Sequence, residues 1–240
     1  MALDHALMAR ARVTGEAVLR VYTWSSPVLS LGRNQCAIGV YDDIELDSRG
    51  IVVVRRPTGG RALLHHREIA YSVTAPSRSN EALGAAYRRI NDLLVTALAS
   101  MGVAAGIAKP AMRAAAPGPQ PCFALPAAGE IIVGNRKLVG SAQWREDDAL
   151  LQHGSILVEN DQSIIPTLMR TSVIVPPAPV TLRDLLHRTP AAAELADALF
   201  AALRQTIDPA AAPLSEREAH ALDLAPLVEH YHNPAWTWRR

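Results

Sequence analysis

Lysine and cysteine are both scarce in this chain of 240 residues. Lysine occurs only as Lys109 and Lys137, so 22 of the 24 basic residues are arginine. The two cysteines, Cys36 and Cys122, are too few for a disulfide framework, and no Cys/His spacing typical of zinc is present. These absences exclude a disulfide-rich secreted module and a zinc domain, so we expect reduced thiols and no bound metal.

Strong net charge and long apolar runs are also lacking. The formal net charge is +1, which removes the electrostatic footprint expected of a nucleic-acid-binding protein. The longest weakly polar run, residues 94–108, is too short to span a bilayer, and the first residues lack the pattern of a secretory signal. With 49% hydrophobic residues, we expect a globular cytoplasmic protein without nucleic-acid or membrane partners.

Apolar periodicity predicts alternating strands and helices. Strands are predicted at residues 18–24, 28–31, 51–54, 69–74 and 150–158, with a β-hairpin formed by 130–133 and 137–144. Helices are predicted at 3–11, 80–101 and 191–207, and shorter ones begin at Thr181 and at Ser215, which forms a capping box with Glu218. The β-branched run at 51–54 is typical of a strand buried on both faces. We therefore predict one α+β domain over residues 1–240, with a mixed sheet within 18–158 flanked by helices and a mainly helical part at 160–240.

A polar, glycine-containing segment follows the third predicted strand. Gly59 and Gly60 can adopt positive φ and allow backbone N–H groups to approach a ligand, while Arg55, Arg56 and Arg61 add positive charge. Such a segment suits a phosphate, a carboxylate or a thioester carbonyl. An ordinary turn with solvated arginines is the alternative, and the spacing matches neither a Walker loop nor a dinucleotide fingerprint.

Cys122 lies in a loop between Pro121 and Pro126. A buried structural thiol is the usual role of a single cysteine, whereas a nucleophile needs partial exposure and a nearby cation. Lys137, fifteen residues further along, would supply that cation if the loop folded back over the hairpin. Both interpretations stay open on this evidence, and Cys36, at a strand end, is interpreted as structural.

Two polar runs of small residues interrupt adjacent predicted strands. They are residues 140–143 (GSAQ) and 152–155 (QHGS). Small side chains there would keep the sheet surface open for a bound chain or nucleotide, and local bulges are the alternative. His65 and His66 would point to opposite faces of a strand, so this pair does not indicate a metal site.

Four motifs, taken in order, resemble those of the biotin/lipoate protein ligase superfamily. They are residues 31–35 (LGRNQ), 55–65 (RRPTGGRALLH), 134–143 (GNRKLVGSAQ) and 151–155 (LQHGS). The resemblance covers residues 1 to about 160, and residues 231–240 also resemble the family's C-terminus. It implies the catalytic-domain fold of that family. The segment Pro121-Cys122-Phe123 is most similar to that of the cysteine-dependent octanoyltransferases.

This resemblance implies an acyltransferase of lipoate biosynthesis. Such an enzyme moves octanoyl from octanoyl-acyl carrier protein, through a thioester on Cys122, to a lysine of a lipoyl domain or of the glycine-cleavage H protein, and needs no cofactor. Lys137 is the second catalytic residue that the resemblance implies. The residues implied to bind substrate are Arg56, Thr58, Gly59, Gly60, Arg61, His65, Gly140, Ser141, Ala142, His153 and Gly154.

Two other functions stay open. An ATP-dependent lipoate-protein ligase would work through lipoyl-AMP, would need ATP and Mg²⁺, and would use Lys137 to contact the adenylate. A non-catalytic paralogue that binds an acyl chain or its carrier is suggested by two departures from the family. The family's His-Asp pair is His65-His66 here, and the sequence starts at the first helix without the family's earlier strand, which indicates either a misplaced start codon or a trimmed sheet edge.

Overall fold

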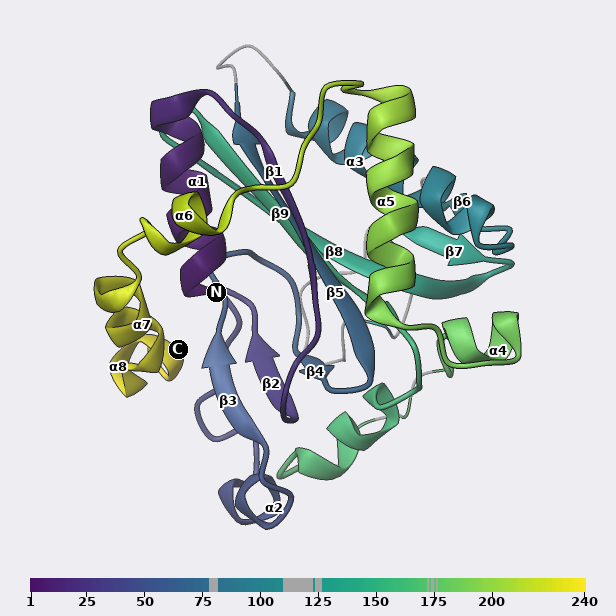
Figure 1. Ribbon diagram of the computed structural model, residues 1–240. Coiled ribbons are helices and arrows are strands. Elements are labelled where there is room, and N and C mark those ends of the chain that lie inside the picture. Colours follow the sequence, from purple (N-terminus) through teal and green to yellow (C-terminus); the bar gives the residue numbers. More distant parts are fainter. Residues whose placement is uncertain (78–81, 110–122, 124–126, 172, 174, 176) are drawn as a thin grey trace.

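Two β-sheets with flanking helices make up the described part of the chain (Figure 1). The computed structural model describes residues 1–77, 82–109, 123, 127–171, 173, 175 and 177–240. The larger sheet is antiparallel throughout, in the order β1-β5-β9-β8-β7-β6. Its strands are β1 (Val18–Tyr22), β5 (Glu68–Pro76), β6 (Gly106–Ile107), β7 (Ile131–Val133), β8 (Arg136–Glu146) and β9 (Ala149–Leu157).

A smaller sheet of three strands packs beside it. In this sheet β2 (Val28–Leu31) is central, parallel to β3 (Val52–Arg55) and antiparallel to β4 (Leu63–His65). The connection from β2 to β3 contains α2 (Asp43–Ser48), whose N-cap Asp42 accepts from the backbone N–H of Ile44. The segment that joins β3 to β4 is the glycine-containing turn predicted from the sequence, so this turn lies at one end of the smaller sheet.

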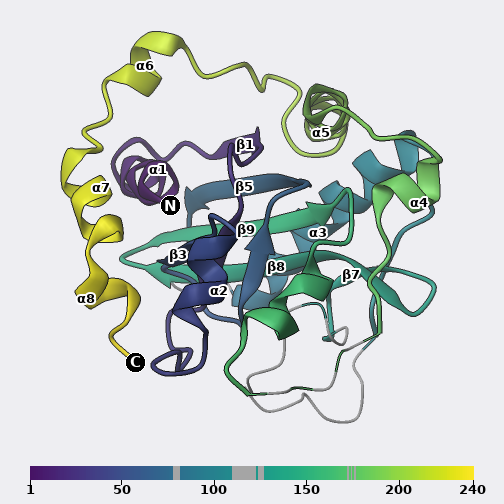
Figure 2. The ribbon, with the colours of Figure 1, turned by 90° about the horizontal axis from the view of Figure 1, so that it is seen from below.

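Helices cover both faces of the larger sheet. On one face lies α1 (Ala2–Thr14), against β5 and β9, and on the other lie α3 (Leu83–Ser100) and α5 (Ala192–Thr206), which share the main apolar core (Figure 1). The remaining elements are η1 (Gln162–Leu168), α4 (Leu182–Leu186), α6 (Glu216–His220), α7 (Ala225–His232) and α8 (Pro234–Thr237). Figure 2 shows the segment from α6 to α8 passing around the outside of α1, and α7 packs against α1.

The alternation of side chains along β5, β8 and β9 gives the larger sheet two different faces. Toward α3 and α5, Ile69, Val139 and Ile156 join the main apolar core. Toward α1 and the smaller sheet, His153 and Ser155 contact polar side chains of those elements. The α1 side of the sheet therefore places polar side chains of β9 against the smaller sheet.

Most of the predicted elements are confirmed. Strands 28–31 and 69–74, the hairpin, the helices beginning near residues 2, 83 and 192, and the capping box of Ser215 with Glu218 are all present. The α+β class with helices flanking the sheet is confirmed as well. No helix in the described part of the chain is both long and apolar enough to cross a membrane.

Three details differ from the predictions. The strand at residues 51–54 is not buried on both faces, because β3 is an edge strand of the smaller sheet and Val52 is 57% exposed. Its β-branched residues indicated β-propensity rather than burial. The strands also fall into two sheets, with parallel pairing only in the smaller one and with β4 unpredicted. Cys36, interpreted as structural, has an exposed thiol.

Candidate active site

The segment from Arg56 to Arg61 forms a tight turn against Gly32. A Cβ atom on Gly32 would overlap the carbonyl oxygen of Gly60, and Gly60 itself has a φ of +97°. Both positions therefore require glycine. The backbone N–H of Arg33 donates to the carbonyl of Thr58 at 2.8 Å, so two of the sequence motifs meet at this turn.

Arg55 and Arg56 hold this turn from inside the protein. The fully buried Arg55 donates to the carbonyl of Gly32 at 2.6 Å. Arg56 donates to the carbonyls of Gly59, at 3.0 Å, and Arg61, at 2.6 Å. The alternative of an ordinary turn with solvated arginines is therefore wrong for Arg55, because its guanidinium is buried and donates to backbone carbonyls.

A row of buried polar side chains connects the turn to α1. The Oγ1 atom of Thr58 lies 2.7 Å from Nε2 of His153, and Nδ1 of His153 lies 3.6 Å from Oδ2 of Asp4. Burial lowers the pKa of His153 although Asp4 opposes this, so the ring is neutral at pH 7. Burial raises the pKa of Asp4, but His153 and Arg20 bring it below its ordinary value.

These charges define the direction of the hydrogen bond to Thr58. With the Asp4 carboxylate on its Nδ1 side, the neutral His153 ring keeps its proton on Nδ1, and Nε2 accepts from the Thr58 hydroxyl. His153 thus orients Thr58 within the turn. Asp4 was not among the predicted site residues.

His65 belongs to a second polar row, behind the turn. Its Nδ1 lies 2.6 Å from Oε1 of Glu68 and its Nε2 lies 2.8 Å from Oγ of Ser30. Ser30 Oγ also accepts from Arg56 at 2.9 Å, so His65 supports the turn through Ser30 and Arg56. The neighbouring His66 points away, with its side chain 42% exposed, which confirms that the two histidines face opposite ways.

Lys137 is buried beside Phe123, the residue that follows Cys122 in the chain. Its side chain is 1% exposed, with Nζ 2.6 Å from Oε1 of Glu130 and 4.8 Å from the centroid of the Phe123 ring. The second oxygen of Glu130 accepts from the backbone N–H of Ala127 at 2.7 Å. Because a buried ammonium needs a charged partner, Glu130 holds the Lys137 side chain in this place. Cys122 itself lies outside the described residues.

The predicted residues of β8 and β9 divide between the two faces of the sheet. On the α1 side lie Gly140, Ala142 and His153, and on the α3 side lie Ser141 and Gly154. A Cβ on Gly140 would lie 3.0 Å from the Phe123 ring, whereas one on Gly154 would lie 2.6 Å from Cε1 of Tyr71. The register of β8 with β9 is continuous over residues 139–146, so local bulges do not explain these glycines.

A polar network on the α3 side reaches the segment that holds Lys137. Gln152 donates to Asn91 at 3.0 Å, and Asn91 donates to the carbonyl of Gly129 at 2.7 Å. Gly129 immediately precedes Glu130, so this bond from α3 fixes the backbone just before β7 on the α3 side of the sheet. This network was not predicted, although a polar Asn91 within the apolar stripe of the helix was a signal that could have indicated it.

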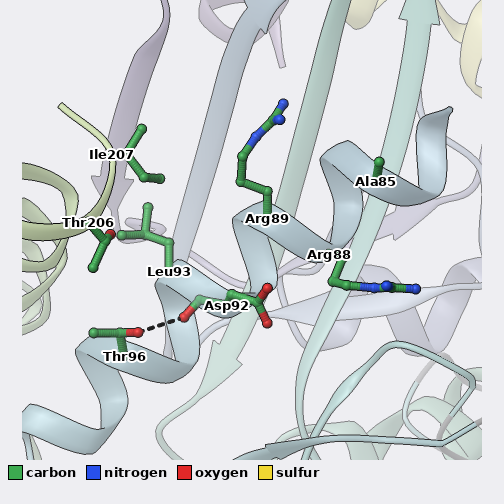
Figure 3. Close-up of a pocket in the computed structure, with 8 residues that line it drawn as sticks. All are labelled: Ala85, Arg88, Arg89, Asp92, Leu93, Thr96, Thr206 and Ile207. Atoms are coloured by element: carbon green, nitrogen blue, oxygen red, sulfur yellow. Dashed lines mark hydrogen bonds between the residues drawn. The ribbon is translucent and has the colours of Figure 1, made fainter. Parts of the chain in front are cut away.

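A surface cavity of about 390 Å³ lies elsewhere, between α3 and the end of α5 (Figure 3). It is lined by Ala85, Arg88, Arg89, Asp92, Leu93, Thr96, Thr206 and Ile207. It shares no residue with the two polar rows or with the Lys137 cluster, so it plays no part in positioning them. In the described residues, no group of three or more His, Cys, Asp or Glu side chains is placed to hold a metal ion.

Comparisons with known sequences define the class of protein. The family model described as the lipoyl protein ligase A/B catalytic domain matches residues 1–204. The octanoyltransferase LipM of Kyrpidia tusciae is 36% identical over 262 residues, covering 100% of this chain and 94% of that protein. The octanoyltransferase LipM of Symbiobacterium thermophilum is 36% identical over 237 residues, which cover 91% of this chain and 86% of that protein. The chain belongs to the lipoyl protein ligase A/B catalytic-domain family.

Solved structures share the fold at low sequence identity. The putative lipoate protein ligase Ta0514 from T. acidophilum gives a TM-score of 0.78 at 21% identity and covers 100% of this chain and 92% of that one. A lipoate-protein ligase A bound with ATP also gives a TM-score of 0.78 at 21% identity. This match covers 99% of this chain and 92% of that one. These matches confirm the catalytic-domain fold that the sequence motifs implied.

Proposed function

We propose that this chain is an octanoyltransferase of lipoate biosynthesis. It takes octanoyl from octanoyl-acyl carrier protein, holds it as a thioester on Cys122, and passes it to a lysine of a lipoyl domain or of the glycine-cleavage H protein, without a cofactor. Relatives named octanoyltransferase LipM support the overall reaction. The observation that carries the mechanism is the buried Lys137–Glu130 pair, packed against the residue that follows Cys122.

In the first half-reaction the Cys122 thiolate attacks the carbonyl carbon of the carrier thioester. A new carbon–sulfur bond forms, the bond to the carrier's sulfur breaks, and the proton given up by Cys122 ends on the departing carrier thiol. The ammonium of Lys137 favours the thiolate and donates to the developing oxyanion. Since one thioester replaces another, the step needs no ATP.

In the second half-reaction a neutral lysine amine of the acceptor attacks the same carbonyl carbon. A carbon–nitrogen bond forms, the bond to Cys122 breaks, and the proton lost by the amine returns to the cysteine sulfur. The amide product is more stable than the thioester, which drives transfer forward. Lys137 again donates to the oxyanion, so a single fixed ammonium serves both halves.

An apolar cluster beside the lysine suits a saturated acyl chain. Leu63 of the smaller sheet, Leu157 of β9 and Phe123 pack together on the α1 side of the larger sheet. Each methylene of octanoyl buried against such a surface contributes about 0.8 kcal/mol. This cluster supports an aliphatic rather than a charged substrate at the Lys137 end of the site.

An assay with two donor systems tests the proposal. Octanoyl-acyl carrier protein alone, and octanoate with ATP and Mg²⁺, are each incubated with the protein and a lipoyl domain, and octanoylation of the domain is followed by mass spectrometry. We expect product only with the carrier-bound donor. Product only with octanoate and ATP would establish a ligase, and carrier binding without product from either donor would establish a non-catalytic paralogue.

A further inference from the structure

Two arginines beside the glycine turn are fixed on tryptophan rings. The guanidinium of Arg33 lies 5.3 Å from the centroid of the Trp144 ring, and that of Arg239 lies 4.0 Å from the Trp236 ring. Arg239 also donates to the carbonyl of Arg33 at 2.6 Å. Within the described part of the chain, neither guanidinium forms an ion pair with a carboxylate. Apart from the Arg239 donor bonded to the Arg33 carbonyl, their N–H groups are therefore available to an anion.

The position of this arginine pair is set by the candidate site itself. The backbone of Arg33 is bonded to Thr58 in the glycine turn. The segment carrying Arg239 is attached to the same turn through Arg55, which donates to the carbonyl of Thr237 at 2.8 Å and accepts from the indole of Trp236 at 2.8 Å. Two cations are thus held at the site by buried contacts rather than by flexible side chains alone.

Neighbouring charges leave the pair electropositive. Partial burial, with the charges of Arg33 and Arg240, lowers the pKa of Arg239 from its ordinary value. Cations that repel one another in this way are stabilised by a bound anion.

The strand β8 connects the arginine pair to Lys137. Gly140, Ala142 and Trp144 lie on the same face of this strand because side chains alternate. A Cβ on Gly140 would lie 3.2 Å from Cε of Lys137, and Trp144 lies beneath Arg33. Four residues of strand span roughly 13 Å. Gly140, Ala142 and Trp144 thus form a row along β8. The arginine pair lies at its Trp144 end and Lys137 at its Gly140 end, with the small side chains of Gly140 and Ala142 between them.

We propose that Arg33 and Arg239 bind the phosphate group of the donor's pantetheine arm while its thioester lies at Lys137. This inference rests on the proposed octanoyltransferase function. A phosphate group accepts paired hydrogen bonds from guanidinium groups. The arm has about thirteen bonds from phosphorus to sulfur, which extend to roughly 16 Å, comparable to the length of the β8 row.

Two small donors that differ only in the phosphate test this proposal. Octanoyl-pantetheine and octanoyl-4′-phosphopantetheine are compared in transfer to a lipoyl domain without ATP. For the wild type we expect kcat/KM to be roughly tenfold or more higher with the phosphorylated donor, since charge-assisted hydrogen bonds are the strong ones. In the double variant Arg33→Gln, Arg239→Gln, the ratio of kcat/KM for the two donors falls toward one.

Arg12→Gln is the matched control, because it removes an arginine of α1 that is paired with Asp147. It keeps the wild-type ratio. Calorimetric binding of 4′-phosphopantetheine and pantetheine to the wild type and the double variant gives the same comparison without turnover, and thermal unfolding verifies that the double variant is folded.

Three outcomes are informative. Equal kcat/KM for the two donors in the wild type, or a ratio that persists in the double variant, overturns the phosphate site while leaving the octanoyltransferase function intact. No transfer from any thioester donor, with transfer from octanoate and ATP, overturns the proposed function as well.

Discussion

Glu130 contacts Lys137 with one carboxylate oxygen and the backbone of Ala127 with the other. The change Glu130→Gln keeps a similar shape and an acceptor but removes the charge that fixes the ammonium. A hydrogen bond to a charged group contributes about 1.5–3 kcal/mol, so we expect kcat for octanoyl transfer to fall roughly tenfold to hundredfold. Steady-state kinetics should show little change in KM for the lipoyl domain.

Asp161→Asn is the control for this change. Asp161 is also a buried carboxylate in an ion pair, with Arg67, but it lies outside the cluster around Lys137. We expect a lower free energy of unfolding for this variant and an unchanged kcat. Equal losses of kcat in the two variants would show that Glu130 acts only through general stability.

The two lysines of the chain offer a second matched pair. Lys137 is enclosed by Glu130, Phe123 and the backbone at Gly140, whereas Lys109 is exposed. A planar guanidinium is broader than an ammonium, so Lys137→Arg should reduce octanoyl transfer by at least roughly tenfold, and Lys109→Arg should leave it unchanged. Comparable activity of the two variants in the transfer assay would count against a catalytic Lys137.

Local motifs predicted Cys122 and Lys137 but not the residues that hold Lys137 and His153 in place. Asp4 reads in the sequence as an acidic residue in the first turn of a helix, which is an ordinary feature of a helix N-terminus. Its role beside His153 depends on how α1 packs across β9, and this long-range contact leaves no pattern in the local sequence.

Among the elements, the glycine turn between β3 and β4 depends on the contact of Gly32 with Gly60. A methyl group on Gly32 would meet backbone rather than a flexible side chain, so the turn cannot accommodate it by a rotamer change. We expect Gly32→Ala to lower the free energy of unfolding by about 1–3 kcal/mol, as overpacking does, and to reduce transfer activity. Denaturant unfolding measures the first effect.

Gly84→Ala is its control, because a Cβ there meets no atom within 4 Å in the first turn of α3. Alanine is favoured over glycine in a helix by about 1 kcal/mol or less, so this variant should be as stable as the wild type or slightly more stable. A Gly32→Ala protein as stable as Gly84→Ala would contradict the role given to the turn.

The division of β8 between two faces was predictable from the sequence once the strand itself was predicted. Alternation alone separates Gly140 and Ala142 from Ser141. Which face α1 covers was not predictable, because it depends on the order of strands in the sheet. The edge position of β3 was missed for the same reason: β-branched composition favours a strand but does not identify its neighbours.

For the whole molecule, the buried His153 makes stability depend on pH. Burial lowers its pKa, so below its ordinary value near 6.5 the unfolded chain binds a proton that the folded chain does not. The free energy of unfolding therefore falls as pH decreases through about 6.5, by up to about 1.4 kcal/mol per pH unit from this group. The lowered pKa of Asp4 contributes stability that is constant above pH 5 and lost only in stronger acid.

Denaturant unfolding at pH 7.5, 6.5 and 5.5 measures this slope. His153→Gln removes the titrating group while leaving an acceptor for the Thr58 hydroxyl, so the decline in stability between pH 7.5 and 5.5 should be smaller than in the wild type. The half-buried His5, whose pKa burial also lowers, is present in both proteins and cancels in the comparison. An unchanged slope would mean that His153 has the same pKa in the folded and unfolded protein, which would contradict the pKa lowered by burial.

A covalent intermediate on Cys122 is the step that separates an octanoyltransferase from a ligase of the same fold. The full-length wild type, Cys122→Ala and Cys36→Ala are each incubated with octanoyl-acyl carrier protein in the absence of ATP, and their intact masses are measured. Cys36 is the internal control because its thiol is exposed and lies outside the Lys137 cluster. We predict an octanoyl adduct on the wild type and on Cys36→Ala but not on Cys122→Ala; no adduct on the wild type, or an adduct that survives Cys122→Ala, would contradict the proposed mechanism.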